Sequence, residues 1–437
     1  MTFRKLAVLL CAVLMLFTFT SCNYFDISAD SLITPPLQDG DIYPIQLALE
    51  KSVGKDITLK YPISGDFRSA FSFKDIDGDG DEEALALYSV SKEGTVSTHL
   101  NIIDNINDEW VSCSDVSVVG NGVEKMTFCD LNNDKIPEII IGWMIYGTVD
   151  KQVGVYTYDG NVLNQRAMEK YTDFICECIN TAGNDELIII NLNTTEKTSA
   201  IKILKLSKTG IAETGTAMLD GGVTSYSVPI VSKLADGRPA LYLDAIKGTG
   251  TLTEIVWFDG TTLKSTYNAV TAETSTTYRP SAVYLRDING DELLDIPMMS
   301  ILPSTVNKPD VDKVYVTSWS NFDGTKLKVI ENTFMNYTDG YYLSIQDNWM
   351  NRLHLARKTD SRQRIFYSYD PKEDVQGAEI FRIISISVSD VETGKFDTTG
   401  YEKLGDYADV AHFAKVIEDN ELKITFEMLK DNFYIIK

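Results

Sequence analysis

The chain has 437 residues, of which 44% are hydrophobic and 10% aromatic, so it can fill a folded core and is not intrinsically disordered. Lys and Arg number 40 against 63 Asp and Glu, which gives a formal net charge of −23. This charge repels phosphate backbones and argues against a nucleic-acid partner. Only three His are present, which leaves little for a His-based zinc site or a Ser-His-Asp relay.

Residues 1–21 have the layout of a secretory signal peptide, with Arg4 and Lys5 before an apolar run over residues 6–17. The run is too short to cross a membrane, since a spanning helix needs about 20 residues. The segment from Phe19 to Cys22 resembles the lipobox of bacterial lipoproteins, although Phe19 stands where that motif usually has Leu. The resemblance implies lipidation of Cys22 and an extracytoplasmic protein anchored to the bacterial cell membrane.

Residues 22–55 are predicted to hold the lipidated cysteine, a polar spacer and one short helix. The helix is expected over residues 45–53, between Pro44 and Gly54. The rest of the chain, residues 56–437, contains four cysteines. Four are too few for a disulfide framework in a chain of this length, so buried thiols are expected rather than disulfides. These residues are Cys113, Cys129, Cys176 and Cys178.

Within residues 56–437, three acidic nine-residue segments recur, at 75–83, 130–138 and 287–295. Each places an oxygen-bearing side chain at positions 1, 3, 5 and 9 and leads into a strand-like run. Weaker echoes keep only that following strand. The ninth positions then fall at residues 83, 138, 186, 240, 295 and 351, an internal repeat of about 54 residues. Asp-Gly hairpin signals keep the same phase at residues 159, 259 and 323.

Each repeat therefore holds about four strands, which is the content of a propeller blade. The predicted fold is all-β: a single β-propeller of seven four-stranded blades, with six or eight blades left open, after the signal peptide and a short linker. Residues 400–437 offer three strands, at 410–416, 422–426 and 433–436, and residues 57–61 are expected to complete this blade and close the ring. A pair of β-sandwich domains is the alternative.

The oxygen side chains of each acidic segment, with a loop carbonyl at position 7, suit Ca²⁺. An EF-hand would need Glu at position 12, where the three segments have Ala86, Ile141 and Met298. The segments instead resemble the calcium loops of FG-GAP or VCBS-type β-propellers, the kind found in integrin α-chain heads and many bacterial surface proteins. Solvated acidic turns are the alternative.

The resemblance implies up to three structural Ca²⁺ sites. In the first loop the ligands would be Asp75, Asp77, Asp79, Glu83 and the carbonyl of Asp81. In the second they would be Asp130, Asn132, Asp134, Glu138 and the carbonyl of Ile136. In the third they would be Asp287, Asn289, Asp291, Asp295 and the carbonyl of Leu293.

The sequence contains no His-Glu-x-x-His, phosphate-loop or Gly-x-Ser-x-Gly motif, so no enzymatic activity is expected. Trp110 and Trp349, which have acidic neighbours, are candidates for a ligand surface, and the other three Trp are expected in the core. The main interpretation is a monomeric, lipid-anchored, calcium-binding propeller that serves as a binding or scaffold protein for a protein or a cell-wall glycan. The alternatives are a polysaccharide-acting propeller hydrolase or lyase, and an envelope-assembly or sensory subunit.

Overall fold

The structure is a computed structural model that describes residues 42–145, 151–207, 210–356 and 362–436. The predicted signal peptide, Cys22 and most of the spacer lie outside these ranges. Within them, no helix is both long enough and apolar enough to span a lipid bilayer.

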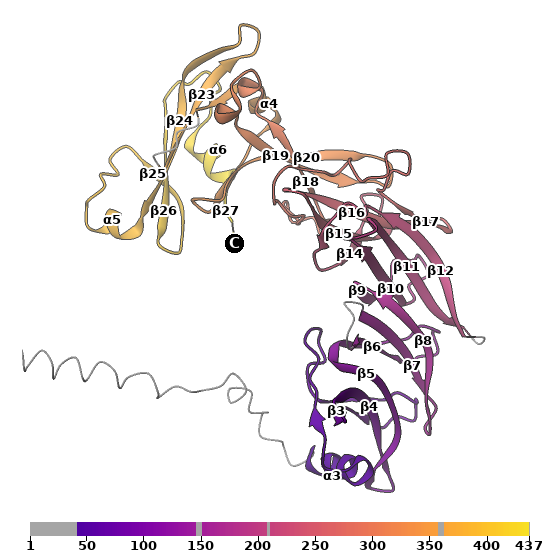
Figure 1. The fold of residues 1–437 in the computed structure, drawn as a ribbon. Helices are drawn as coiled ribbons and strands as arrows, with labels where there is room; N and C mark the ends of the chain where they lie inside the picture. The colour runs from indigo at the N-terminus through magenta and orange to yellow at the C-terminus, as the bar shows by residue number, and fades with distance from the viewer. Residues whose placement is uncertain (1–41, 146–150, 208–209, 357–361, 437) are drawn as a thin grey trace, which may run out of the picture.

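The described chain is an all-β protein made of antiparallel sheets that follow one another in chain order (Figure 1). The first sheet has the order β1-β3-β4-β5-β6-β7-β8, with β2 also paired to β3. Its strands are β1 (Thr58–Leu59), β2 (Phe71–Lys74), β3 (Glu83–Lys92), β4 (Thr95–Ile106), β5 (Glu109–Cys129), β6 (Glu138–Ile145), β7 (Lys151–Tyr158) and β8 (Leu163–Tyr171). The second, of order β12-β11-β10-β9, contains β9 (Asp173–Glu177), β10 (Glu186–Asn193), β11 (Thr198–Ser207) and β12 (Gly210–Leu219).

The third sheet has the order β13-β15-β16-β17, with β14 also paired to β15. Its strands are β13 (Ser225–Tyr226), β14 (Ile230–Lys233), β15 (Pro239–Lys247), β16 (Gly250–Asp259) and β17 (Thr262–Ser265). The fourth, of order β18-β19-β20-β21-β27, contains β18 (Ile296–Ile301), β19 (Tyr315–Phe322), β20 (Leu327–Asn336), β21 (Tyr341–Ser344) and β27 (Phe433–Ile435). The fifth, of order β22-β23-β24-β26-β25, contains β22 (Leu353–Leu355), β23 (Gln363–Asp370), β24 (Val375–Ser387), β25 (Glu402–Tyr407) and β26 (Val410–Val416).

The helices are short apart from α3 (Ile42–Val53), which contains the helix predicted at residues 45–53. The others described are α4 (Asp347–Met350), α5 (Val388–Glu392), α6 (Phe426–Asp431) and the 3₁₀ turns η1 (Pro303–Thr305) and η2 (Asp310–Asp312). Residues 422–426 are therefore not the strand that the sequence predicts, because the last of them begins α6.

The predicted all-β fold with propeller-type blades is confirmed. Each of the six repeat positions falls within two residues of the start of a strand: β3, β6, β10, β15, β18 and β22. The seven-blade count is not confirmed. Residues 283–285, just before the third acidic loop, form no strand, and a single bridge between Arg286 and Asp295 stands in its place.

The predicted closure of the ring by the two chain ends is wrong. In Figure 1 the sheets follow an arc, and the first and last sheets lie far apart. The strand β1 pairs with β3 of its own sheet, through Thr58 and Ser89. The last strand, β27, pairs instead with β21 of the fourth sheet, through Tyr341 and Ile435. Both terminal strands thus complete sheets near them rather than one shared blade.

The strand β5 links the first two blades without a turn. Its first half pairs with β4 and its second half with β6, and the register shifts around Gly120 and Val123. A β-carbon at Gly120 would collide with the carbonyl oxygen of Met144. Glycine at this position therefore lets the bent strand approach β6 closely.

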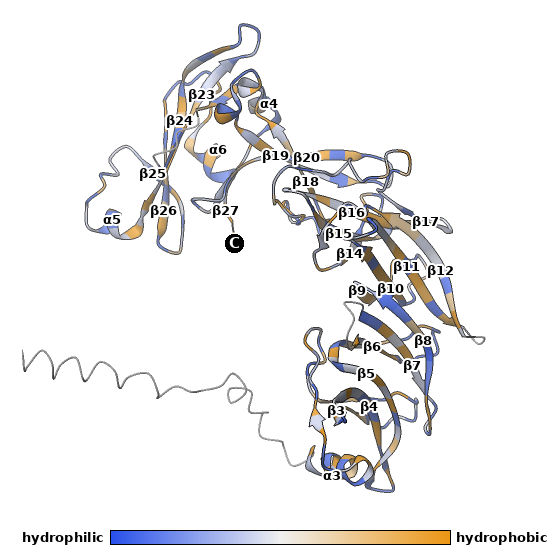
Figure 2. Cartoon of the chain, viewed as in Figure 1, coloured by the Kyte–Doolittle hydropathy of each residue, from blue (hydrophilic) through white to orange (hydrophobic). Residues whose placement is uncertain are grey.

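The hydrophobic core lies between successive sheets, and hydrophobic residues run along the strands in Figure 2. The strand β10 shows the pattern. Leu187 and Ile189 pack into one cluster, whereas Ile188 and Ile190 pack into the next. Because neighbouring sheets cover both faces of such a strand, its sequence is a continuous apolar run rather than an alternation.

Two predictions about single residues are corrected. Cys129 at the end of β5 and Cys176 in β9 form a disulfide, while Cys113 and Cys178 are free. Trp349 is only 1% exposed, because it packs in the core cluster under β21 and β22, and so offers no ligand surface. Trp110 is half-buried beside the core of α3.

Candidate functional site

The three acidic segments form loops with one hydrogen-bond pattern, in which side chains accept from the loop backbone. Position 1 accepts from the N–H of position 6, position 3 from position 5, position 5 from position 7, and position 9 from position 2. In the first loop the acceptors are Asp75, Asp77, Asp79 and Glu83, at 3.2, 3.2, 2.9 and 2.9 Å. In the second they are Asp130, Asn132, Asp134 and Glu138, at 2.8, 2.8, 2.8 and 2.7 Å. In the third they are Asp287, Asn289, Asp291 and Asp295, at 2.9, 3.0, 2.9 and 2.9 Å.

The backbone of the three loops is also the same, since positions 4 and 6 are left-handed in each. The first loop has Gly78 and Gly80 at these positions. The other two keep the conformation with ordinary residues at position 6: Lys135 at φ 75° and Glu292 at φ 67°. For a non-glycine residue this left-handed conformation is less stable by roughly 1–2 kcal/mol. The three loops thus keep one backbone shape even where the residue at position 6 disfavours it.

The first loop brings three carboxylates close enough to share a cation. One oxygen each from Asp75, Asp77 and Glu83 lies within 4.8 Å of the others. Among the described residues, no second group of three His, Cys, Asp or Glu side chains comes as close. The other two loops have Asn132 and Asn289 where the first has Asp77.

Position 9 of each loop is a buried acid whose charge the protein alone does not balance. Glu83, Glu138 and Asp295 are 0%, 2% and 0% exposed. Oε1 of Glu83 and Oδ1 of Asp295 accept no hydrogen bond within the described part of the chain. A hard cation is the partner that such buried, unsatisfied oxygens fit, so the residues present suit Ca²⁺.

The pKa values of these three acids are raised, which agrees with the lack of a nearby positive charge. Burial raises the pKa of Glu83 to about 7 and that of Asp295 to about 6. In each case the hydrogen bond from one backbone N–H lowers the pKa, and the negative charges of other loop acids raise it further. Burial likewise raises the pKa of Glu138 to about 7, with Asp134 and Asp130 adding to it. A bound cation would keep these groups ionised, because it stabilises the charged form.

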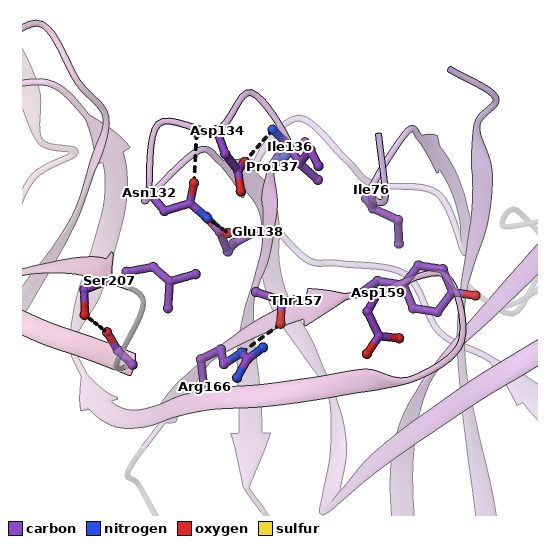
Figure 3. Close-up of a pocket in the computed structure, with 13 residues that line it drawn as sticks. Ile76, Asn132, Asp134, Ile136, Pro137, Glu138, Thr157, Asp159, Arg166 and Ser207 are labelled. Atoms are coloured by element: carbon purple, nitrogen blue, oxygen red, sulfur yellow. Dashed lines mark hydrogen bonds between the residues drawn. The ribbon is translucent and has the colours of Figure 1, made fainter. Parts of the chain in front are cut away.

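The first two loops are neighbours. A β-carbon on Gly78 would lie 2.7 Å from Cδ1 of Ile136, so the turn of one loop rests on the side chain of the next. A cavity of about 380 Å³ lies beside them. Figure 3 shows Asn132, Asp134 and Glu138 on one side of it, and Thr157, Asp159 and Arg166 from the β7–β8 hairpin on the other.

The predicted ligand sets are thus placed on three matching loops, but their role as calcium ligands stays a prediction. The same holds for the carbonyl ligands assigned to Asp81, Ile136 and Leu293.

A second polar feature lies at the opposite ends of the strands. Lys151 and Tyr171 pair where β7 begins and β8 ends, away from the second acidic loop. They line a groove of about 840 Å³ together with the β10–β11 turn. Seven further lining residues carry an aliphatic hydroxyl or an amide side chain: Thr172, Asn191, Asn193, Thr194, Thr195, Thr198 and Ser199.

Hydrogen bonds fix the walls of this groove. Oγ1 of Thr172 accepts from the backbone of Leu192 at 2.8 Å, which joins the link after β8 to β10. Oδ1 of Asn193 accepts from the N–H groups of Thr195 and Glu196 at 3.1 and 3.0 Å. Ser199 donates to the carbonyl of Asn191 at 3.0 Å. The groove is therefore pre-organised, which lowers the ordering cost of binding.

Sequence reasoning missed a set of buried charges in the third sheet. Arg279 is fully buried and donates to Asp244 at 2.7 Å. Asp220 is paired with Lys247 at 2.9 Å, and its backbone N–H donates to the buried Glu254. Because these groups satisfy one another, we assign them to the packing of the sheet. They stand outside the repeated loop pattern, so no sequence signal marked them.

No protein-family model and no curated protein sequence matches the chain. Solved structures with a similar trace include a periplasmic gluconolactonase from Pseudomonas aeruginosa, with 10% identity, coverage of 74% of this chain and 87% of that one, and a TM-score of 0.26. A rhamnogalacturonan lyase has 10% identity, coverage of 74% and 76%, and a TM-score of 0.29. An exo-β-1,3-galactanase from Phanerochaete chrysosporium has 11% identity, coverage of 76% and 80%, and a TM-score of 0.22.

The comparison with these solved structures corrects one prediction. The chain was expected not to be an enzyme, but the three solved proteins named above are enzymes, so that expectation is not kept. Their low TM-scores transfer no chemistry to this chain. The resemblance of the acidic loops to FG-GAP or VCBS-type propellers likewise stays a prediction.

Proposed function

We propose that this chain is an extracytoplasmic β-propeller of the FG-GAP or VCBS type that binds calcium in its three acidic loops and acts on polysaccharide. It would be a monomer tethered to the bacterial membrane through lipid on Cys22. Hydrolysis and lyase-type elimination are the two chemistries to test.

The observation that supports calcium binding is the threefold recurrence of one loop geometry that ends on a buried acid. Calcium at these loops would act as a structural ion, because it would neutralise one buried acid in each loop together with the more exposed carboxylates beside it. Glu83 and its counterparts would hold the ion from the strand side, and Asp75, Asp77 and Asp79 would hold it from the loop.

The observation that favours polysaccharide is the pre-organised polar groove. Hydroxyl and amide side chains exchange hydrogen bonds with sugar hydroxyls in both directions, as donors and as acceptors.

The calcium proposal is tested by thermal unfolding of residues 42–437 in calcium, in magnesium and in chelator. Calcium at about a hundred times its Kd would add about 2.7 kcal/mol to the free energy of unfolding for each site. The unfolding midpoint should therefore rise in calcium and not in magnesium.

Asp77→Ala should lower the calcium stoichiometry from three to two. Asp81→Ala is the matched control in the same loop, because it removes an exposed carboxylate but keeps the backbone carbonyl. Equal midpoints in calcium and chelator would refute the proposal.

The polysaccharide part is tested by incubating the calcium-loaded protein with a panel of neutral and acidic polysaccharides. New reducing ends would indicate cleavage, and the ultraviolet absorbance of unsaturated sugars would separate elimination from hydrolysis. If the folded, calcium-loaded protein neither cleaves nor binds any polysaccharide of the panel, this part of the proposal is rejected.

A further inference from the structure

Each ninth-position acid lies where a strand begins, and a ladder joins that strand to the next one along the chain. The paired residues nearest the three loops are Ala84 and Ile103, Ile139 and Tyr156, and Ile296 and Ser320. One residue closer to each loop, Glu83 faces Asp104, Glu138 faces Thr157 and Asp295 faces Asn321. Side chains directly opposite in an antiparallel ladder share one face, with β-carbons about 4.5–5.5 Å apart. Each acid therefore has an oxygen-bearing side chain, its facing residue, on the neighbouring strand.

The facing residues of the first and third loops do not balance the charge of the acid. Burial raises the pKa of Asp77 and that of Glu83, and the negative charge of Asp104 raises both further. Asn321 is 6% exposed, and its Oδ1, like Oδ1 of Asp295, accepts no hydrogen bond within the described part of the chain. Buried oxygens that face one another in this way need a cation between them.

Basic side chains on the other neighbouring strand do not supply this cation. Lys74 pairs with Glu83 across the β2–β3 ladder, and Arg286 forms the bridge with Asp295. Within the described ranges, neither basic side chain forms an ion pair with its acid. The guanidinium of Arg286 instead lies 5.6 Å from the ring centroid of Trp319. The two acids are thus left without a positive partner from the protein.

The repeat position at residue 186 solves the same problem differently. Glu186 is 1% exposed and begins β10, and one residue beyond the pair of Leu187 and Leu204 it faces Lys205. Nζ of Lys205 lies 3.3 Å from Oε1 of Glu186. The loop before Glu186 has lost the acids of positions 1, 3 and 5, which are here Cys178, Asn180 and Ala182. Where the loop has no carboxylates to hold an ion, the facing residue is therefore an amine that pairs with the acid.

The next repeat position shows the third case. Residue 240 is Ala rather than an acid, and it pairs directly with Trp257 on β16. A repeat without the buried acid thus has an apolar facing residue. The facing residue changes with the acid and with the loop, as expected if all three serve one charge balance.

We propose that the facing residue decides how the buried acid is neutralised: an oxygen side chain leaves the acid to Ca²⁺, whereas a lysine supplies the positive charge itself. Lys205 would thus take the place of an ion beside Glu186, and Asp104 and Asn321 would keep the first and third loops dependent on calcium. An ammonium group is a compact point charge on a flexible stem, so it can neutralise one acid without the six to eight oxygens that Ca²⁺ gathers. This inference rests on the calcium part of the proposed function and names the residue that selects the ion.

The test transplants the lysine into the first loop. Asp104→Lys should lower the calcium stoichiometry in titration calorimetry from three to two, because an amine would then pair with Glu83. The same variant should unfold at a higher temperature than the unmodified protein in chelator, since its buried acid no longer waits for an ion. Asn321→Lys should act in the same way on the third loop.

Two further variants complete the design. Glu93→Lys makes the same change of charge in the exposed turn at the far end of the β3–β4 hairpin, so it should leave the stoichiometry at three. Lys205→Met should lower the unfolding midpoint by equal amounts in calcium and in chelator, because the loop before Glu186 lacks the carboxylates to replace the amine with an ion.

The paired readouts separate this inference from mere damage and from the proposed function. If Asp104→Lys keeps three calcium ions, or loses one and also unfolds at a lower temperature in chelator, the lysine does not replace the ion and the inference is overturned. Three ions bound by the unmodified protein would still support the calcium sites in that case. If the unmodified protein binds no calcium, the proposed function fails first, and this inference fails with it.

Discussion

At the residue scale, the acid at position 9 is the buried carboxylate of each loop. Glu83 accepts a hydrogen bond from Ile76 through one oxygen, while its other oxygen is buried without a partner. Asp295 repeats this arrangement with Ile288. In the second loop, the amide of Asn132 donates to the second oxygen of Glu138 at 3.1 Å. The second loop is therefore the one in which the protein itself partly satisfies the acid.

The raised pKa of Glu83 gives a prediction for the calcium-free protein. Its pKa of about 7 exceeds the ordinary 4.5, so between these pH values the native state binds more protons than the unfolded state. The free energy of unfolding should then fall as pH rises from 4.5 towards 7. Because calcium would bind the ionised acids, the midpoint gain from calcium should grow over the same interval. Calorimetry at several pH values, in chelator and in calcium, measures both trends.

Glu83→Gln should remove part of this pH dependence, because the amide does not titrate. Glu82→Gln serves as the control, since Glu82 is the exposed neighbour in the same loop. If both variants keep the slope of the unmodified protein, the buried acid is not its source.

At the scale of elements, the disulfide between β5 and β9 joins two successive blades at the base of the second acidic loop. Cys129 directly precedes Asp130, the first position of that loop. The bond therefore anchors the loop entrance to the next sheet, across 47 residues of sequence.

Loss of this bond should destabilise the protein. The double substitution of Cys129 and Cys176 by Ala should lower the free energy of unfolding by about 2–4 kcal/mol, because the unfolded chain loses a long cross-link. Cys178→Ala should change little, since that thiol is free. Thermal unfolding with and without reductant supplies the check: a midpoint that reductant does not move in the unmodified protein would contradict the bond.

The features that the sequence predicted have local signals, whereas those it missed depend on contacts between distant parts of the chain. The strands β3, β6 and β10 follow from local signals, an acidic loop or an apolar run at a fixed spacing. The disulfide depends on two strands at equivalent places in successive repeats. Cys129 and Cys176 stand nine and ten residues before their repeat positions, which is the signal that could have paired them. The burial of Trp349 has no such signal, because its polar sequence neighbours belong to a turn of α4 over the core.

At the scale of the whole molecule, the C-terminal strand holds two sheets together. β27 pairs with β21, and Phe433 stacks on Tyr341 with ring centroids 5.0 Å apart. On the other side, Phe433 lies 5.4 Å from the ring of His412 on β26 of the fifth sheet. This non-local contact is why the predicted ring closure by residues 57–61 fails, since the last strand is already paired elsewhere.

Two substitutions in β27 test this account. Phe433→Ala should lower the free energy of unfolding by about 3 kcal/mol, because the ring is 8% exposed and contacts both sheets. Tyr434→Ala, in the same strand, should cost about 1 kcal/mol or less, because that side chain is 44% exposed and lies against Tyr342 alone among the ring contacts described. Urea unfolding measures both, and equal losses would contradict a special role for Phe433.

The continuous strand β5 has a consequence for how the folded chain can be cut. Between the first two blades there is no exposed turn, because the same strand forms ladders with β4 and with β6. A protease needs an unpaired, extended segment, so it would have to unzip hydrogen bonds to both partners before reaching a peptide bond there. Limited digestion of the native protein should therefore leave the first two blades joined within β5.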